Sequence, residues 1–177
     1  LKRYLKQIRY LASKNEARIY ETLSPDQKVQ FILKFWKVRD PTPDTPQNEF
    51  AAEHFSRVNY ADEHFPSRPG RVGSDTAMGR IHIKYGFPTD IERSPFSARG
   101  KAYEIWTYEH LNYYECAFLD RLGDGIFDMV HSTMNGERYN PNWREEMAIG
   151  DQFDPTAGPA DLPKGDGFPP EATTTGP

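Results

Sequence analysis

The chain has 177 residues, of which 14% are aromatic, with a formal net charge of -4 and a mean hydropathy of -0.80. This length allows one domain with a sizeable core, and the acidic balance argues against non-specific nucleic-acid binding, which needs clustered positive charge. The single cysteine, Cys116, excludes an internal disulfide and a cysteine-based zinc site. No apolar run reaches the length of a membrane span and no signal peptide pattern is present, while the first residue, Leu1, is consistent with a processed chain.

Charge is distributed unevenly along the chain. Residues 1–21 carry six Lys or Arg against two acidic residues, whereas residues 150–177 carry five acidic residues against one lysine. We interpret the two oppositely charged ends as the parts of the chain that hold partners.

The first half of the sequence predicts helices. Apolar residues at helical spacing indicate a basic amphipathic helix over residues 1–22, which packs on its own domain or, as the alternative, lies on a membrane surface or a partner. A second helix starts at Ser24 and Pro25, which suit the N-cap and the first helical position. Three prolines in residues 41–46 end this helix, and Thr45 with Pro46 predicts the start of a third over residues 47–64. We expect the buried face of the second helix to be formed by Val29, Ile32, Leu33 and Trp36.

The second half predicts strands. Apolar residues alternate with polar ones over residues 79–85, the period of a half-buried strand. Further strands are predicted at residues 103–108, 114–119 and 126–131, and a turn at 123–125 joins the last two. Asn140 and Pro141 predict the start of a short final helix that ends near residue 149. The expected fold class is therefore α+β, with N-terminal helices packed on a small, mostly antiparallel four-stranded sheet.

The composition changes from Gly150 onward. Six of the fifteen prolines lie in residues 150–177, with few large apolar side chains. Such a segment cannot bury enough surface to fold alone, so we expect an extended Pro/Gly-rich tail that lies against another chain. The sequence thus divides into a basic helix at residues 1–23, an α+β domain at 24–149 and the tail at 150–177.

Two stretches carry a resemblance to a known family. Residues 35–50 read Phe-Trp-Lys-Val-Arg-Asp-Pro-Thr-Pro-Asp-Thr-Pro-Gln-Asn-Glu-Phe, and residues 79–88 read Gly-Arg-Ile-His-Ile-Lys-Tyr-Gly-Phe-Pro, followed by Tyr-Glu-Ile-Trp at 103–106. These stretches resemble the signatures of the bacterial GWxTD domain family, and the resemblance spans residues 24–131. The name-giving motif is degenerate, since residues 73–77 read Gly-Ser-Asp-Thr-Ala where the family has Gly-Trp-x-Thr-Asp. The resemblance implies an exported, periplasmic or surface-associated protein without an established catalytic site.

The sequence shows no arrangement typical of catalysis. The five histidines are scattered, and we interpret His54 and His64, which share a predicted helix, as structural residues rather than metal ligands. Cys116 lies in a predicted strand without a neighbouring base, which indicates a buried, inert thiol. The serine and glycine spacings match neither a nucleophile elbow nor a phosphate-binding loop. We therefore expect no enzyme, no cofactor and no metal.

The aromatic residues of the predicted strands are the strongest indication of a binding surface. Strand alternation places Trp106 and Tyr108 on the face opposite Tyr103 and Ile105, so that one face is core and the other is available to a partner. The partner-binding residues that we predict are Tyr4, Arg9, Trp106, Tyr108, Tyr113, Phe153 and Phe168.

These observations favour a non-catalytic scaffold or accessory subunit of a larger, membrane-associated assembly, of respiratory or photosynthetic type, on the periplasmic side. It would hold other protein subunits through its first helix and its tail, and would bind no nucleic acid. The alternative is a small-ligand-binding protein or an enzyme of unspecified reaction. That alternative uses a groove near Arg80, His82, Asp90 and Trp106.

Overall fold

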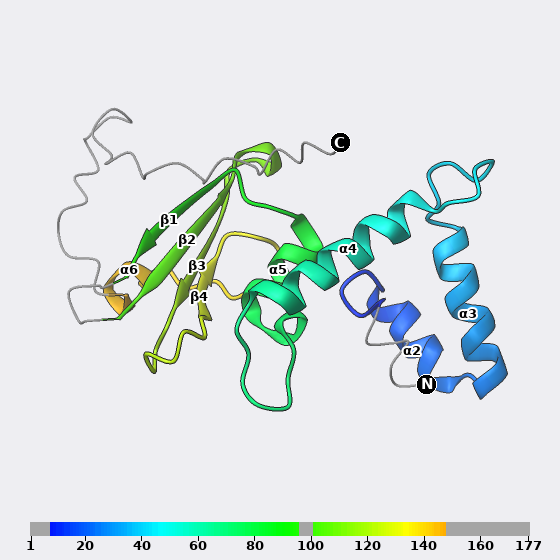
Figure 1. Cartoon of the computed structure of the whole chain (residues 1–177), viewed down its shortest axis with the longest axis horizontal. Helices are drawn as coiled ribbons and strands as arrows, with labels where there is room; N and C mark the ends of the chain where they lie inside the picture. Colours follow the sequence, from blue (N-terminus) through cyan, green and yellow to red (C-terminus); the bar gives the residue numbers. More distant parts are fainter. Residues whose placement is uncertain (1–7, 96–100, 148–177) are drawn as a thin grey trace, which may run out of the picture.

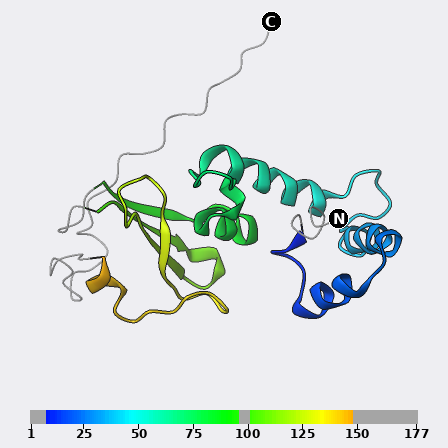
Figure 2. The same ribbon diagram turned by 90° about the horizontal axis from the view of Figure 1, so that it is seen from below.

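A computed structural model describes residues 8–95 and 101–147 of the chain. Helices α2 and α3 lie at one end of the molecule and the β-sheet at the other, with helices α4 and α5 between them (Figure 1). The view turned by 90° shows the same order along the long axis (Figure 2). The helices are α2 (Lys14–Thr22), α3 (Pro25–Lys37), α4 (Glu49–His64), α5 (Ala77–Tyr85) and α6 (Trp143–Glu146), with short 3-10 turns η1 (Gly73–Asp75) and η2 (Glu109–Leu111).

Capping side chains set the starts of α2 and α3. Ser13 Oγ accepts a hydrogen bond from the Glu16 amide at 3.2 Å, and Glu16 Oε2 accepts one from the Ser13 amide at 2.8 Å. This capping box begins a new helix at Lys14, so the prediction of one helix over residues 1–22 is wrong in the described part. The predicted start of α3 is confirmed, because Ser24 and Gln27 form the same reciprocal pair.

Helix α4 begins later than predicted, because Asn48 rather than Thr45 is its N-cap. The Asn48 Oδ1 accepts a hydrogen bond from the Ala51 amide at 2.8 Å, while its Nδ2 donates to the Trp36 carbonyl at 2.8 Å. One side chain therefore both caps α4 and fixes its N-terminus to the end of α3. Thr45 lies in the preceding loop, where its hydroxyl donates to the carbonyl of Thr42 or of Gln47, each at 2.9 Å.

The sheet is a four-stranded antiparallel meander in the order β1-β2-β3-β4, which confirms the α+β class. Strands at residues 103–108 and 114–119 were predicted correctly, and the last strand starts two residues later than predicted. The bounds are β1 (Asp90–Ser94), β2 (Tyr103–Tyr108), β3 (Tyr114–Leu119) and β4 (Asp128–Ser132).

The prediction of a strand over residues 79–85 is wrong, since this stretch forms most of helix α5. Thr76 caps the helix, its Oγ1 accepting a hydrogen bond from the Gly79 amide at 3.0 Å. The helix is buried on several sides, and Ile81, His82 and Ile83 are each at most 1% exposed. A nearly enclosed helix loses the 3.6-residue apolar period, so a short buried helix can show the alternation of a strand. The strand that completes the four-stranded sheet is instead β1, an edge strand whose residues are mostly polar and largely exposed.

Both faces of the sheet are covered. One face packs against α5 through a cluster that includes Met78, Ile81 and Trp106, and the other packs against α6 through Trp143 and Met147. Trp106 and Tyr108 do lie opposite Ile105, as alternation predicted. The short final helix exists as α6, although only residues 143–146 are helical and the predicted end near residue 149 lies outside the described residues.

Helices α2 and α3 form a separate small core with the segment before them. Ile8, Tyr20, Ile32 and Phe35 are buried together, and the rings of Tyr20 and Phe31 meet edge to face with centroids 5.6 Å apart. The predicted buried face of α3 is therefore partly wrong, because Val29 is 43% exposed and Leu33 is 59% exposed.

Candidate functional site

The motif at residues 73–76 is the junction at which three parts of the chain meet. Gly73 packs so closely on α4 that a Cβ there would lie 1.8 Å from the Ala61 carbonyl oxygen. Gly79 of α5 packs equally closely on the motif, since its Cβ would lie 2.1 Å from the Gly73 carbonyl oxygen. The two glycines are required for the contact between α4, η1 and α5.

Polar groups of the same motif bind the N-terminal segment. Asp62 of α4 accepts a hydrogen bond from the Ser74 amide at 2.7 Å. The Ser74 carbonyl accepts hydrogen bonds from Arg9 Nη2 at 2.8 Å and from the Tyr10 hydroxyl at 2.7 Å. Arg9 also forms an ion pair with Asp75. The structure thus gives Arg9, predicted to bind a partner, an intramolecular role at this junction.

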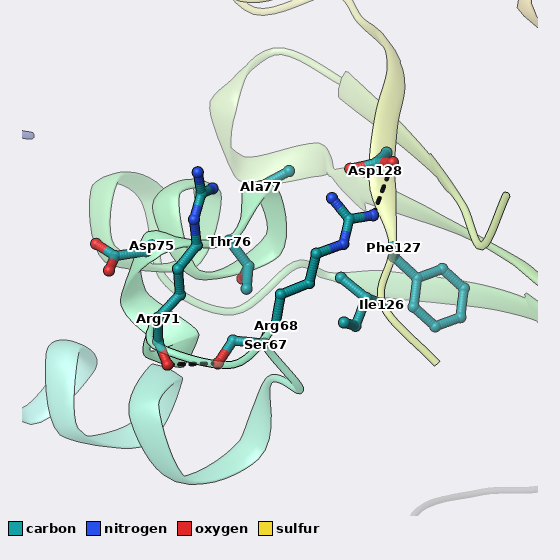
Figure 3. Close-up of a pocket in the computed structure, with 9 residues that line it drawn as sticks. All are labelled: Ser67, Arg68, Arg71, Asp75, Thr76, Ala77, Ile126, Phe127 and Asp128. Carbon is teal, nitrogen blue, oxygen red and sulfur yellow. Dashed lines mark hydrogen bonds and ion pairs between the residues drawn. The ribbon is translucent and has the colours of Figure 1, made fainter. Parts of the chain in front are cut away.

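A small pocket lies beside the motif, between α5 and the segment that leads into β4 (Figure 3). Its volume is about 80 Å³, well below the roughly 300–1,000 Å³ typical of small-molecule sites. Arg68 and Arg71 extend along its two sides with Thr76 between them, and Arg68 reaches Asp128 at 3.9 Å. The pocket is lined by Ser67, Arg68, Arg71, Asp75, Thr76, Ala77, Ile126, Phe127 and Asp128.

The chemistry of this pocket does not support catalysis. Its nine lining residues include neither histidine nor cysteine, and the two carboxylates are engaged by arginines, Asp75 by Arg9 and Asp128 by Arg68. The Thr76 hydroxyl donates to the Gly73 carbonyl at 2.6 Å while it caps α5, so it is occupied by the local backbone. A nucleophile with an adjacent base is what acyl or group transfer needs, and these residues do not supply one.

The structure does not bring the four residues of the predicted ligand groove together. Arg80 extends from α5 to Glu137, which it contacts at 2.8 Å, whereas His82 lies on the side of α5 that faces Tyr60. Trp106 is 2% exposed and donates through Nε1 to Glu104 at 2.8 Å. Asp90 is exposed on the edge strand β1.

Glu137 is a nearly buried carboxylate held between two cations of α5. Its side chain is 7% exposed, with Oε2 accepting from Arg80 at 2.8 Å and Oε1 from Lys84 at 2.7 Å. Burial alone would lower the pKa of Lys84, but the interactions with Glu137 and Tyr85 together outweigh this effect and the pKa is raised. This arrangement fixes the loop after β4 to α5.

His82 is enclosed by aromatic rings. The Tyr60 ring centroid lies 4.7 Å and the Phe87 centroid 4.5 Å from the imidazole, and Nδ1 has no hydrogen-bond partner. Burial, together with the positive charge of Arg57, lowers the pKa of His82 to about 4. The imidazole is therefore neutral at physiological pH.

The other candidate residues, Cys116, His54 and His64, are engaged in packing or hydrogen bonds within the protein. Cys116 is fully buried, its Sγ lies 3.2 Å from Ser132 Oγ, and burial raises its pKa to about 11. His54 packs against Trp36, whereas His64 stacks on Tyr60 with ring centroids 4.0 Å apart. Within residues 8–95 and 101–147, no three His, Cys, Asp or Glu side chains are grouped so that they could hold a metal ion.

The predicted partner-binding residues have different locations. Trp106 and Tyr108 are 2% and 0% exposed, so the expectation that they present an open surface is wrong: α5 covers their face. Tyr113 is 73% exposed after η2 and remains available. Tyr4, Phe153 and Phe168 lie outside the described residues.

An exposed apolar surface that the sequence did not predict lies on α3. Val29 and Leu33 are four residues apart, Trp36 follows on the same side of the helix, and its ring centroid lies 6.3 Å from that of Phe50 on α4. Phe50 is 37% exposed and Trp36 is half-buried. We name these four residues, Val29, Leu33, Trp36 and Phe50, the open strip. Their spacing was visible in the sequence, but helical spacing alone cannot tell an open face from a buried one.

Comparisons of the chain with protein-family models, with curated proteins and with solved structures find no match. Among the described residues, no helix has both the length and the apolar character needed to cross a bilayer.

Proposed function

We propose that this protein is a non-catalytic accessory protein that binds another protein chain through the open strip of α3. The observation that carries the proposal is that α3 has apolar residues both on its buried side and on an exposed side. The helix buries Ile32 and Phe35 in the core with α2, yet it leaves Val29 and Leu33 about half exposed on another side. A helix with apolar residues over most of its circumference is typical of one that is covered on several sides.

The remaining features fit this proposal. The aromatic residues of the sheet are used in packing on both faces, and the cations and carboxylates around α5 are paired with one another. The open strip carries two aromatic rings beside two aliphatic side chains, and aromatic residues are enriched among the residues that dominate binding energy at interfaces. A wider proposal, that the partner belongs to a membrane-associated assembly, rests on the basic charge of residues 1–21.

The pocket beside the motif does not favour a second function. It is small, and its two carboxylates are paired with arginines. The enzyme or ligand-binding alternative is therefore not proposed.

The test uses the full chain and two matched substitutions, Leu33→Asp in the open strip and Leu122→Asp in the β3–β4 turn. Leu122 is 71% exposed and Leu33 59%, so both variants should fold. A partner is first isolated from the native source by cross-linking and mass spectrometry, then purified and titrated with each variant. We expect Leu33→Asp to weaken binding at least about tenfold and Leu122→Asp to leave it unchanged. Equal binding by the two variants, or a full chain that cross-links to no other protein, would overturn the proposal.

A further inference from the structure

The loop after β4 contains a tight turn whose exposed tip lies between two buried anchors. The Glu137 amide donates to the Met134 carbonyl at 3.2 Å, which closes a four-residue turn. Met134 is 3% exposed and the Glu137 side chain 7%, whereas Asn135 and Gly136 between them are exposed. The core and α5 therefore hold the two ends of the turn, and only its central residues face solvent.

Gly136 determines the type of this turn. Its φ is +80°, while Asn135 is not one of the described non-glycine residues with a positive φ, so the turn is of type II. Because Gly136 has no side chain, its amide nitrogen is unshielded beside the side-chain amide of Asn135. Among residues 8–95 and 101–147, no hydrogen bond engages the Asn135 side chain, so this side chain can rotate toward the Gly136 nitrogen.

An exposed asparagine that precedes a glycine can lose its side-chain amide without an enzyme. The Gly136 nitrogen gives its proton to water and attacks Asn135 Cγ. A new N–C bond forms, the Cγ–Nδ2 bond breaks, and Nδ2 leaves as ammonia with a proton taken from water. Water then opens the cyclic imide at either of its carbonyls, which leaves aspartate or isoaspartate at position 135. The only co-reactant is water.

The neighbouring asparagines lack this combination of features. Asn140 precedes Pro141, which has no N–H group with which to attack. Asn142 is exposed too, but it precedes Trp143, whose large side chain hinders the approach of the nitrogen. Asn135 is the only asparagine of the chain that is followed by glycine.

We propose that Asn135 is a site of spontaneous deamidation, and that its isoaspartate product releases the loop after β4 from α5. Isoaspartate carries the main chain through Cβ and so adds one backbone atom to the turn. Met134 is packed in the core, whereas Glu137 is held by its ion pairs with Arg80 and Lys84. The added length is therefore taken up at the Glu137 end, and the carboxylate moves away from the two cations.

The experiment uses the full, folded chain, stored in mildly alkaline buffer and compared with fresh protein. Trypsin then releases two adjacent peptides: residues 122–138, whose one asparagine is Asn135, and residues 139–144, which carry Asn140 and Asn142. Liquid chromatography with mass spectrometry follows both. We expect the peptide of residues 122–138 to lose its amide at least about tenfold faster than its neighbour and to give isoaspartate as well as aspartate.

Equal rates in the two peptides would overturn the proposed site. Aspartate as the only product would also overturn it, because direct hydrolysis of the side chain gives no isoaspartate. A sample kept unfolded in urea is the third arm, and modification confined to that sample would show that the folded turn shields Asn135. The variant Asn135→Gln, which would have to form a larger ring, is expected to keep its amide.

Urea unfolding tests the effect on the loop. We expect stored wild-type protein that has become mostly isoaspartate to unfold at a lower urea concentration than fresh protein, whereas Asn135→Gln keeps its midpoint on storage. Asn135→Asp carries the charge of the product on a normal backbone, and we expect it to unfold near the wild-type midpoint.

An unchanged midpoint in the stored wild-type protein would overturn the release of the loop. Asn135→Asp destabilised as much as the stored protein would do so too, since the charge rather than the added backbone atom would then be the cause. None of these measurements involves the open strip of α3. The deamidation of Asn135 can therefore fail its test while the Leu33→Asp titration still supports partner binding, and the reverse can also occur.

Discussion

Arg9 and Asp75, sixty-six residues apart in the chain, form an ion pair at 2.5 Å, and the same Arg9 nitrogen donates to the Ser74 carbonyl at 2.8 Å. This pair joins the N-terminal segment to the turn before α5. Because Ile8, next to Arg9, is fully buried in the core of α2 and α3, the contact links this end of the molecule to the helices α4 and α5 in its middle (Figures 1 and 2).

Arg9→Met is expected to destabilise the protein by about 1–2 kcal/mol, since it removes a charge-assisted hydrogen bond from a partly buried carboxylate and another from a backbone carbonyl. Urea unfolding measures the free energy. The matched control is Arg93→Met, which breaks an ion pair with Glu104 where the arginine is 58% exposed, and we expect it to cost less than about 0.5 kcal/mol. Equal losses in the two variants would contradict the structural role of Arg9.

The two glycines of the junction give a second prediction. Gly73→Ala would place a methyl group 1.8 Å from the Ala61 carbonyl oxygen, and this atom belongs to the backbone of α4, which cannot move aside without cost. We expect a loss of at least about 3 kcal/mol in the free energy of unfolding. Thermal and urea unfolding measure it.

Gly123→Ala is the control for this substitution. Gly123 has open space around it and a φ of +71°, so the alanine meets no atom and costs only the strain of a left-handed backbone, about 1 kcal/mol. If Gly73→Ala proved as mild as Gly123→Ala, close packing of η1 on α4 would be the wrong explanation for the glycine.

The sequence predicted those elements whose signals are local. Ser24 with Gln27 fixes the start of α3 through neighbouring backbone groups, and the β-prone residues of β2 and β3 alternate as a sheet requires. The helix α5 could not be recognised in this way, because its apolar pattern reflects burial by α4 and the sheet together. The strand β1 was missed because its residues are mostly polar, and its place is set by pairing with β2.

The candidate site was less predictable for the same reason. Val29, Ile32, Leu33 and Trp36 were predicted to form one buried face of α3, and this is only partly right, because whether an apolar face is covered depends on where the neighbouring helices pack. In this structure Tyr20 of α2 packs against Phe31 and is buried together with Ile32. The side of α3 that carries Val29 and Leu33 is left exposed. Trp106 and Tyr108 show the opposite case, since α5 covers a sheet face that alternation alone could not show to be closed.

Glu137 gives a third prediction. Glu137→Gln removes the charge that faces Arg80 and Lys84 and leaves two partly buried cations without a counterion. Loss of one member of a fully buried ion pair costs several kcal/mol, and because these cations are 35% and 25% exposed we expect a smaller cost of about 2 kcal/mol. Urea unfolding at neutral pH measures it.

Glu145→Gln is the matched control, because Glu145 is exposed on α6. We expect it to change the free energy of unfolding by less than about 0.5 kcal/mol. A Glu137→Gln variant as stable as this control would show that the contact between the loop after β4 and α5 does not depend on the carboxylate charge.

His82 gives a prediction on pH. Its pKa in the folded protein is about 4, against about 6.5 in an unfolded chain, because burial and Arg57 disfavour the imidazolium. Between these two values the unfolded state binds more protons than the folded state, so stability falls as the pH decreases from 6.5 toward 4. At pH 5 the contribution of His82 to this loss is about 2 kcal/mol.

The substitution His82→Phe removes the titrating group and keeps an aromatic ring between Tyr60 and Phe87. We expect the variant to resemble the wild-type protein near pH 7 and to be less sensitive to acid, with a smaller loss of unfolding free energy between pH 7 and pH 5. Urea unfolding at a series of pH values gives both curves, and an NMR titration of the His82 imidazole in the wild-type protein gives the folded-state pKa directly. Parallel curves for the two proteins, or an imidazole that titrates near 6.5, would show that His82 is solvated rather than enclosed. The aromatic packing between α4 and α5 would then have to be looser than the ring distances indicate.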